Sequence, residues 1–197
     1  MGLKQWFTGS NPQSGVGIVL SGPNHDNKQQ IVHQLTQQQQ CWRSVSVTTR
    51  SPRRDEVPGM DYYFVSTNDF EAKFRNNEFL EYANLHGSWY GTLRSPVERH
   101  LKRGTDVLFT VNVQGGMALQ QKLTPLLTVF VEPADQAVLT EYLRRAGFDE
   151  AAVQSRLETA YKEAAIAHKR YDYVVSSQQI DDAVATIGDG VNQLRSQ

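Results

Sequence analysis

Short runs of apolar residues recur along the chain, and they constrain the fold more than any other feature of the sequence. They are GVGIVL at Gly15–Leu20, DVLFTVNV at Asp106–Val113, Leu126–Val131 and Tyr173–Ser176. Runs of this length and composition are typical of buried strands. Buried strands occur in parallel sheets that helices cover on both faces, so these runs predict a sheet of that kind.

The segments between these runs carry the signs of helices. Ile31, Val32 and Leu35 have helical spacing within the predicted helix Lys28–Gln38. Strands that alternate with helices predict an α/β fold, a parallel sheet flanked by helices and joined by right-handed crossovers. Further helices are predicted at Pro96–Arg103, Asp135–Arg145, Asp149–Arg170 and Asp181–Leu194, the last weakened by Gly188 and Gly190, and a half-exposed strand is predicted at Trp42–Thr49.

Composition excludes several classes of protein. With 197 residues, a net charge of −1 and 39% hydrophobic residues, the chain is long enough for one sizeable core. Its charge gives no sign of a nucleic-acid or membrane partner, and no apolar run is long enough to span a bilayer. The single cysteine, Cys41, excludes an internal disulfide and fits a reducing compartment, so we expect a cytoplasmic protein. The histidines have no metal-ligand spacing, so we predict no metal site.

The segment SGPNHDNKQQ, residues 21–30, follows the first predicted strand and raises the question of a phosphate site. Gly22 and Lys28 have the separation of the phosphate-loop pattern G-x-x-x-x-G-K followed by Ser or Thr. Asn27 occupies the position of the second glycine, and Gln29 occupies the position of the hydroxyl residue. Taken alone, the segment leaves open a damaged nucleotide site, a site adapted to another ligand or a chance turn.

A richer set of polar residues follows in SVSVTTRSPRRDEVPGMDYYFVS. Arg50 and Arg53, three residues apart, can converge on one phosphate because guanidinium donors match phosphate oxygens. Glu81 is a carboxylate of the kind that pairs with the N1–H and amino group of guanine. The other candidates in this part of the chain are Ser46, Arg54, Glu56, Tyr62, Tyr90 and Thr92.

These residues carry a resemblance to a known family. VSVTTRSPRRDE, GMDYYFVS, NNEFLEYANLHGSWYGT and VQG follow one another as in guanylate kinases, and the chain resembles that family over roughly residues 16–195. The resemblance implies a P-loop NTPase-type core, an inserted GMP-binding lobe, a small helical lid, and phosphoryl transfer from ATP to GMP with Mg²⁺. We expect a flexible tail at 1–14, a core of 15–44, 97–138 and 165–197, a GMP-binding lobe at 45–96 and a lid at 139–164.

Most acceptor-side positions of the family are present in this chain. By resemblance, Arg50, Arg53, Tyr62 and Tyr90 hold the GMP phosphate. Ser46, Glu81 and Thr92 read the base, and Glu56 matches a further acceptor-site position. Asn112 is the exception, because family members have an aspartate there that also faces guanine. A neutral amide can still accept from guanine, so we expect altered base discrimination. Surface arginines paired with Asp55 and Glu56 are the alternative interpretation of this set.

The donor side departs from the family at many positions. His25 and Asn27 replace glycines of the loop, and Asp26 adds negative charge where phosphates bind. Gln29 replaces the hydroxyl that supports Mg²⁺, and Thr110 stands where the family has a second magnesium-supporting aspartate. In the lid, Ala146 replaces an expected arginine, and Ser176–Gln178 replaces the adenine-side Val-Asn-Asp. The remaining catalytic candidates are Lys28, Arg144 and Arg156, and Gly22 remains from the loop.

Three functions compete on this sequence. The first is a pseudokinase that binds GMP or a related guanine nucleotide and has lost most features that bind ATP and Mg²⁺. The second is an active guanylate kinase with a modified donor site, which would use ATP and Mg²⁺. The third is a protein-interaction module in which the old GMP pocket binds a protein partner. The pattern of retained and lost residues favours the first.

Overall fold

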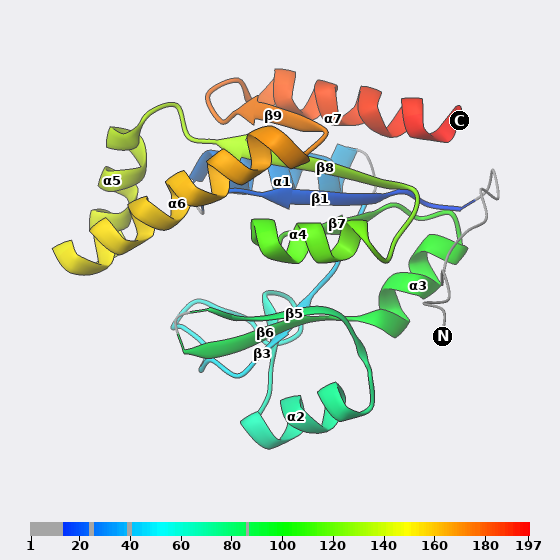
Figure 1. Cartoon of the computed structure of the whole chain (residues 1–197), viewed down its shortest axis with the longest axis horizontal. Helices are drawn as coiled ribbons and strands as arrows, with labels where there is room; N and C mark the ends of the chain where they lie inside the picture. The colour runs from blue at the N-terminus through cyan, green and yellow to red at the C-terminus, as the bar shows by residue number, and fades with distance from the viewer. Residues whose placement is uncertain (1–13, 24–25, 39–40, 86) are drawn as a thin grey trace.

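A five-stranded parallel sheet forms the centre of the computed structural model, which describes residues 14–23, 26–38, 41–85 and 87–197. Its strands lie in the order β2-β7-β1-β8-β9, and every pair is parallel, which confirms the α/β prediction (Figure 1). The strands are β1 (Gly17–Ser21), β2 (Trp42–Arg43), β7 (Val107–Phe109), β8 (Leu126–Glu132) and β9 (Tyr173–Ser176).

Helices cover both faces of this sheet, because its strands are apolar on both sides. One face packs against α1 (Asp26–Gln38) and α7 (Ile180–Arg195), with Ile31, Leu35 and Ile187 fully buried. The opposite face packs against α3 (Arg94–Lys102), α4 (Val113–Gln120) and the C-terminal part of α6 (Glu150–Arg170), and α5 (Gln136–Arg145) packs against the N-terminal part of α6.

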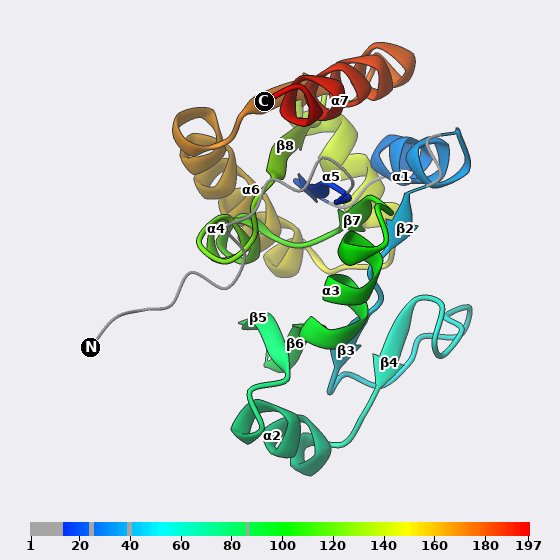
Figure 2. The same ribbon diagram turned by 90° about the vertical axis from the view of Figure 1, so that its right-hand side faces the viewer.

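A second sheet lies below the first, and the chain passes between the two sheets after β2 and again through α3 (Figure 2). Its order is β4-β3-β6-β5, with one parallel pair, β3–β4, and two antiparallel pairs. Its elements are β3 (Ser46–Thr48), β4 (Tyr62–Phe64), α2 (Thr67–Arg75), β5 (Phe79–Leu85) and β6 (Ser88–Leu93). All of them lie within the segment 45–96, and we refer to this part as the lower lobe.

Two predicted strands were wrong in extent. Trp42–Thr49 is not one strand, because β2 pairs with β7 in the central sheet while β3 pairs in the lower lobe. The strand predicted at Asp106–Val113 ends at Phe109, and a helix that the sequence analysis missed, α4, begins at Val113. Asn112 caps that helix, since its side chain accepts a hydrogen bond from Gly115 N at 2.9 Å.

The closing helix α7 is continuous through Gly188 and Gly190, which the sequence suggested would weaken it. Gly190 is buried against β8, and a Cβ atom there would lie 3.1 Å from both methyl groups of Leu127. Tertiary contact therefore outweighs the low helix propensity of glycine at this position.

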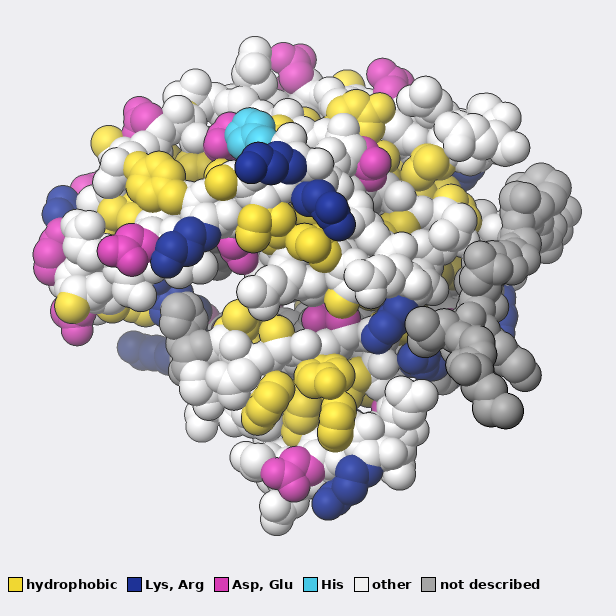
Figure 3. Space-filling model, in the orientation of Figure 1, with side chains coloured by type: hydrophobic (Ala, Val, Ile, Leu, Met, Phe, Trp, Pro, Cys, Tyr) yellow, Lys and Arg dark blue, Asp and Glu magenta, His cyan; other side chains and the backbone are white. Residues whose placement is uncertain are grey.

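An exposed group of aromatic rings marks the lower lobe. Phe74, Tyr82 and Trp89 are 48%, 46% and 36% exposed, and Tyr82 contacts both of the other rings. Figure 3 shows hydrophobic side chains gathered on this lobe. In the part of the chain that the structure describes, no helix has the length and apolar character needed to cross a membrane.

Asp106 ties the start of the central sheet to the end of the chain. Its carboxylate accepts from Val16 N at 2.8 Å and from Arg195 Nη2 at 2.7 and 2.8 Å, and it is only 7% exposed. These bonds connect β7, the segment before β1 and α7, so the carboxylate stabilises the packing of all three.

We expect Asp106→Ala to lower the free energy of unfolding by about 2–3 kcal/mol, because it removes charge-assisted hydrogen bonds and leaves the buried Val16 N–H without its acceptor. Urea unfolding measures the change. Arg195→Ala is the matched control and should cost about 1 kcal/mol or less, because the arginine is half exposed. Equal losses in the two variants would contradict a special role for the buried carboxylate.

Candidate nucleotide-binding site

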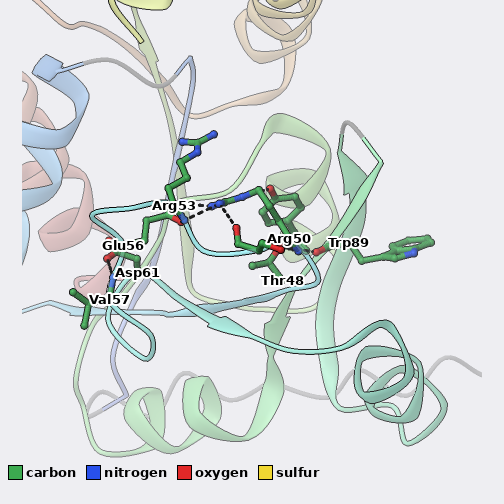
Figure 4. A network of polar contacts seen from close by, with 9 residues as sticks. Thr48, Arg50, Arg53, Glu56, Val57, Asp61 and Trp89 are labelled. Atoms are coloured by element: carbon green, nitrogen blue, oxygen red, sulfur yellow. Dashed lines mark hydrogen bonds and ion pairs between the residues drawn. The ribbon is translucent and has the colours of Figure 1, made fainter. Parts of the chain in front are cut away.

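Arg50 is the centre of a polar network in the lower lobe, just after β3 (Figure 4). Its guanidinium donates to both oxygens of Glu56 at 2.7 and 2.9 Å, and its Nε donates to the Tyr90 hydroxyl at 3.2 Å. Glu56 also accepts from Arg53 N at 2.8 Å. The hydrogen bonds to Glu56 lower the pKa of that carboxyl and raise the pKa of Arg50, so both groups stay charged.

Aromatic rings enclose the same arginine. The Arg50 guanidinium carbon lies 5.4 Å from the centre of the Tyr62 ring and 5.9 Å from that of Phe64. Tyr62 and Tyr90 meet edge to face with ring centres 5.8 Å apart. The tyrosine hydroxyls and the arginine that the sequence assigned to phosphate binding are therefore brought together by β3, β4 and β6.

Arg53 takes a different direction from Arg50. In Figure 4 the side chains of Arg50 and Glu56 point toward one another, whereas the guanidinium of Arg53 points away from them. It lies near Arg156 of α6, since burial and then the charge of Arg53 lower the pKa of Arg156. Arg156 also lies over the Phe148 ring, 4.0 Å from its centre. Two cations from different parts of the chain thus lie within electrostatic reach of each other.

The residues predicted to read the base form a second, buried group. Glu81 is 6% exposed and accepts from Thr92 Oγ1 at 2.5 Å across the β5–β6 pair. A Cβ atom on Gly115 would lie 3.0 Å from Glu81 Oε2 and 3.2 Å from Asn112 Oδ1, so the carboxylate and the amide flank the same glycine. Burial raises the pKa of Glu81, and this effect exceeds the opposing effects of Thr92 and Lys122.

Ser46 and Asn112 are the other two residues predicted to face the base. Ser46 begins β3, is half-buried and lies in register with Tyr62 of the Arg50 group. Asn112 and Glu81 both lie close to Gly115, but the Asn112 side-chain oxygen caps α4. Its acceptor is therefore already engaged with the backbone, which the sequence analysis did not foresee.

The segment after β1 begins with a glycine in a positive-φ conformation. Gly22 has φ +124°, and a Cβ atom there would lie 2.3 Å from the Val131 carbonyl oxygen, so only glycine fits. Lys28, in the first turn of α1, is 7% exposed and donates to the Gly22 carbonyl at 2.6 Å. Burial lowers the pKa of Lys28 to about 8.

The other loop residues are engaged with neighbouring elements. The Asn27 amide donates to the Ser177 carbonyl at 2.9 Å, and Asp26 accepts from Arg145 Nη2 at 3.0 Å. Asp26 therefore pairs with the predicted lid instead of with Lys28. Gln29 is exposed at the surface of α1. His25, which the sequence places at a glycine position, lies outside the described residues.

The lid arginines divide between two partners. Arg144, the catalytic candidate, is bound to Glu150 at 3.1 Å within the lid, and both side chains are more than half exposed. Arg145, which was not a candidate, is the one that reaches the loop. The sequence shows two adjacent arginines and cannot show which of them points toward the loop.

Glu163 is a further residue that sequence reasoning missed. It belongs to α6, accepts a hydrogen bond from the backbone N–H of Val113, and its charge favours the protonated form of Lys28. Burial raises the pKa of Glu163. Its position two turns after Arg156 on the same helix was the only signal available in the sequence.

The residues at the expected magnesium position do not match those of the family pattern. An exposed glutamine, Gln29, stands where a hydroxyl is expected, and Thr110 follows β7 where an aspartate is expected. Among the described residues, no group of three or more His, Cys, Asp or Glu side chains is placed to hold a metal ion. We therefore derive no step through a metal.

Comparison with known proteins gives the family. The guanylate kinase family model matches residues 14–194. The chain belongs to the guanylate kinase family. It is 37% identical over 182 residues to a guanylate kinase of Fusobacterium nucleatum, a match that covers 90% of this chain and 98% of that protein. It is 39% identical over 169 residues to one of Thermus thermophilus, covering 85% and 76%.

A solved structure agrees with the sequence comparison. The crystal structure of guanylate kinase from Anaplasma phagocytophilum aligns with a TM-score of 0.75 and 28% identity, over 94% of this chain and 88% of that chain. The family resemblance and the P-loop NTPase-type fold predicted from the sequence are both confirmed.

The buried Glu81 predicts a pH-dependent stability difference. Because its pKa is raised in the folded protein, its stabilising contribution is present below the unfolded pKa of about 4.3 and is lost as the pH rises. We expect ligand-free Glu81→Gln to match the wild type near pH 4 and to have the higher free energy of unfolding at pH 7. Urea unfolding at both values tests this, and a variant that is less stable at pH 7 than at pH 4, relative to wild type, would contradict it.

Proposed function

We propose that this member of the guanylate kinase family binds GMP or a related guanine nucleotide through the lower lobe and transfers phosphate from ATP weakly or not at all. Support comes from a contrast between two groups of residues. The acceptor residues gather around a charged arginine and a buried carboxylate, whereas several donor residues are engaged with one another. The Asp26–Arg145 ion pair is the observation that carries the proposal.

The acceptor argument rests on charge and shape. A GMP phosphate needs donors, and Arg50 and the Tyr62 and Tyr90 hydroxyls lie together where they can supply them. A guanine edge presents paired N–H donors, and Glu81 is a buried acceptor whose desolvation is compensated when such donors arrive. Asn112, near Glu81, has a neutral amide where the family has an aspartate, and its oxygen already accepts a hydrogen bond from Gly115 N. This favours weaker discrimination between bases.

The donor argument rests on competition. A triphosphate at the loop must displace Arg145 from Asp26 or accept a carboxylate beside its own negative charge. The family supports Mg²⁺ at positions where this chain has Gln29 and Thr110. Phosphoryl transfer depends almost entirely on positioning and neutralising the transferred group, so these changes act on the rate directly.

An active kinase with a modified donor site is the second candidate. It is favoured by Lys28, which holds the family position at the start of α1, and by Arg156, which faces Arg53 from α6. A third candidate is a protein-binding module in which the old GMP pocket holds a phosphorylated protein partner. The exposed Phe74, Tyr82 and Trp89 on the same lobe favour it.

Calorimetric titration separates the candidates. We expect saturable binding of GMP, and little binding of ATP in the presence of Mg²⁺. Micromolar ATP binding together with production of GDP and ADP would support the active kinase and contradict our proposal. Absence of binding by either nucleotide would contradict it in favour of a protein partner.

Arg50→Ala should weaken GMP binding by about 1.5–3 kcal/mol, the usual contribution of a hydrogen bond to a charged group. Arg54→Ala is the matched control, because Arg54 is an exposed arginine in the same loop and should change binding little. Equal effects of the two substitutions on the affinity measured by calorimetry would mean that general positive charge, and not the Arg50 network, binds the phosphate.

A repaired loop tests the donor half. We expect Asp26→Gly combined with Asn27→Gly and Gln29→Ser to increase ATP affinity and phosphoryl transfer, because these changes free Arg145 and restore the second glycine and the hydroxyl residue of the phosphate-loop pattern. A coupled assay of ADP formation and calorimetry with ATP measure the gain. Asp182→Gly is a control that removes an acidic residue from the first turn of α7. No gain in the repaired variant would show that the loop residues do not limit the reaction.

A further inference from the structure

Arg43 is a cationic residue that has none of the phosphate-binding, base-binding or catalytic roles discussed above. It is the last residue of β2 and lies in register with Leu108 of β7. It therefore stands at the carboxyl edge of the parallel sheet, the edge at which β1 leads into the loop that contains Gly22 and Lys28. Ligands of open parallel sheets bind at this edge.

Strand alternation fixes the side of the sheet on which Arg43 lies. Cys41 packs with Ile31, Val32 and Leu35 of α1, whereas Trp42 stacks on His100 of α3 with ring centres 4.1 Å apart. Successive side chains of a strand point to opposite faces. Arg43 therefore points to the face of Cys41 and α1, where Lys28 begins the helix.

The guanidinium of Arg43 has an unsatisfied donor. Its Nε is buried, and among the described residues it has neither a hydrogen-bond partner nor a carboxylate that forms an ion pair with the guanidinium. Buried polar groups are nearly always paired in folded proteins, and an unpaired one costs stability. Groups of this kind are concentrated at functional sites.

Arg43 also lies within electrostatic reach of both parts of the candidate site, the loop that contains Lys28 and the lower lobe. Its charge lowers the pKa of Lys28, after the larger effects of burial and Glu163. The pKa of Tyr62 is raised, chiefly by burial and then by Tyr90, and the charge of Arg43 opposes that rise after the larger effect of Arg50. Arg43 is thus near the lysine of the loop and near the tyrosine of the lower lobe at the same time.

We propose that Arg43 binds a phosphate group between the loop that contains Lys28 and the lower lobe. This phosphate would be the second phosphate of a guanosine diphosphate whose first phosphate lies at Arg50. This inference rests on the proposed binding of guanine nucleotides. The Arg43 guanidinium, whose Nε has no partner among the described residues and which lies within electrostatic reach of Lys28 and Tyr62, matches a phosphate in charge and in hydrogen-bond geometry. The loss of stability from the unpaired Nε is then explained by the need to keep the guanidinium available for the ligand.

The test compares GMP and GDP binding, by calorimetry without metal, for the wild type and for Arg43→Met. We expect the substitution to weaken GDP binding about tenfold, the effect of losing one hydrogen bond to a charged group, and to change GMP binding less than twofold. Arg43→Lys should give an intermediate loss for GDP, because it keeps the charge without the planar donors. Arg75→Met, at the exposed end of α2, is the matched control.

Thermal unfolding separates this role from a structural one. Without ligand, Arg43→Met should unfold at the same or a higher temperature than wild type, because an unpaired buried donor is replaced by an apolar group. With GDP, its increase in unfolding temperature should be smaller than that of wild type. A lower unfolding temperature without ligand, or unchanged GDP affinity in a variant that still binds GMP, would overturn the inference. Wild type that binds neither nucleotide would overturn the proposed function itself.

Discussion

A close approach between two backbones at Gly22 underlies the arrangement of the candidate site. The chain leaves β1 with a glycine of positive φ, and a Cβ atom at this position would lie 2.3 Å from the carbonyl oxygen of Val131 in β8. This turn begins the loop before α1, and the Gly22 carbonyl accepts the hydrogen bond that orients Lys28. The loop, the lysine and the start of α1 therefore depend on one position that only glycine can occupy.

In the candidate site, several cations are held by anions of the protein itself. Arg50 is bound by Glu56, Arg145 by Asp26, and Lys28 is influenced by Glu163. Such pairs keep cationic side chains near one another without large repulsion, and a phosphate ligand must compete with them. This competition differs between the acceptor and the donor residues. Glu56 orients Arg50 within its aromatic enclosure, whereas Asp26 connects the loop to Arg145 in the predicted lid. This difference is the physical basis for proposing that the acceptor half works better than the donor half.

The strands of the central sheet and most of the helices could be predicted because their residues carry regular patterns of apolar side chains. The prediction failed at α4, whose sequence VQGG has weak helical propensity and whose start depends on the Asn112 cap. It also failed at β2 and β3, because one alternating run supplies strands to two different sheets. For the site, the sequence identified Arg50, Glu81 and their neighbours, but not Arg43 or Glu163, whose proximity to Lys28 comes from elements far apart in the chain.

The sequence by itself determined the α/β class, the family and the inventory of acceptor and donor residues, since apolar periodicity and ordered motifs are local properties of the chain. The tertiary structure decided which charges meet. It paired Asp26 with Arg145, engaged Asn112 in a helix cap and, within the described part of the chain, left the Arg43 Nε without a hydrogen-bond partner. These outcomes depend on how the sheet brings distant side chains to one edge, and on the desolvation that follows, neither of which is encoded in the spacing of residues along the chain.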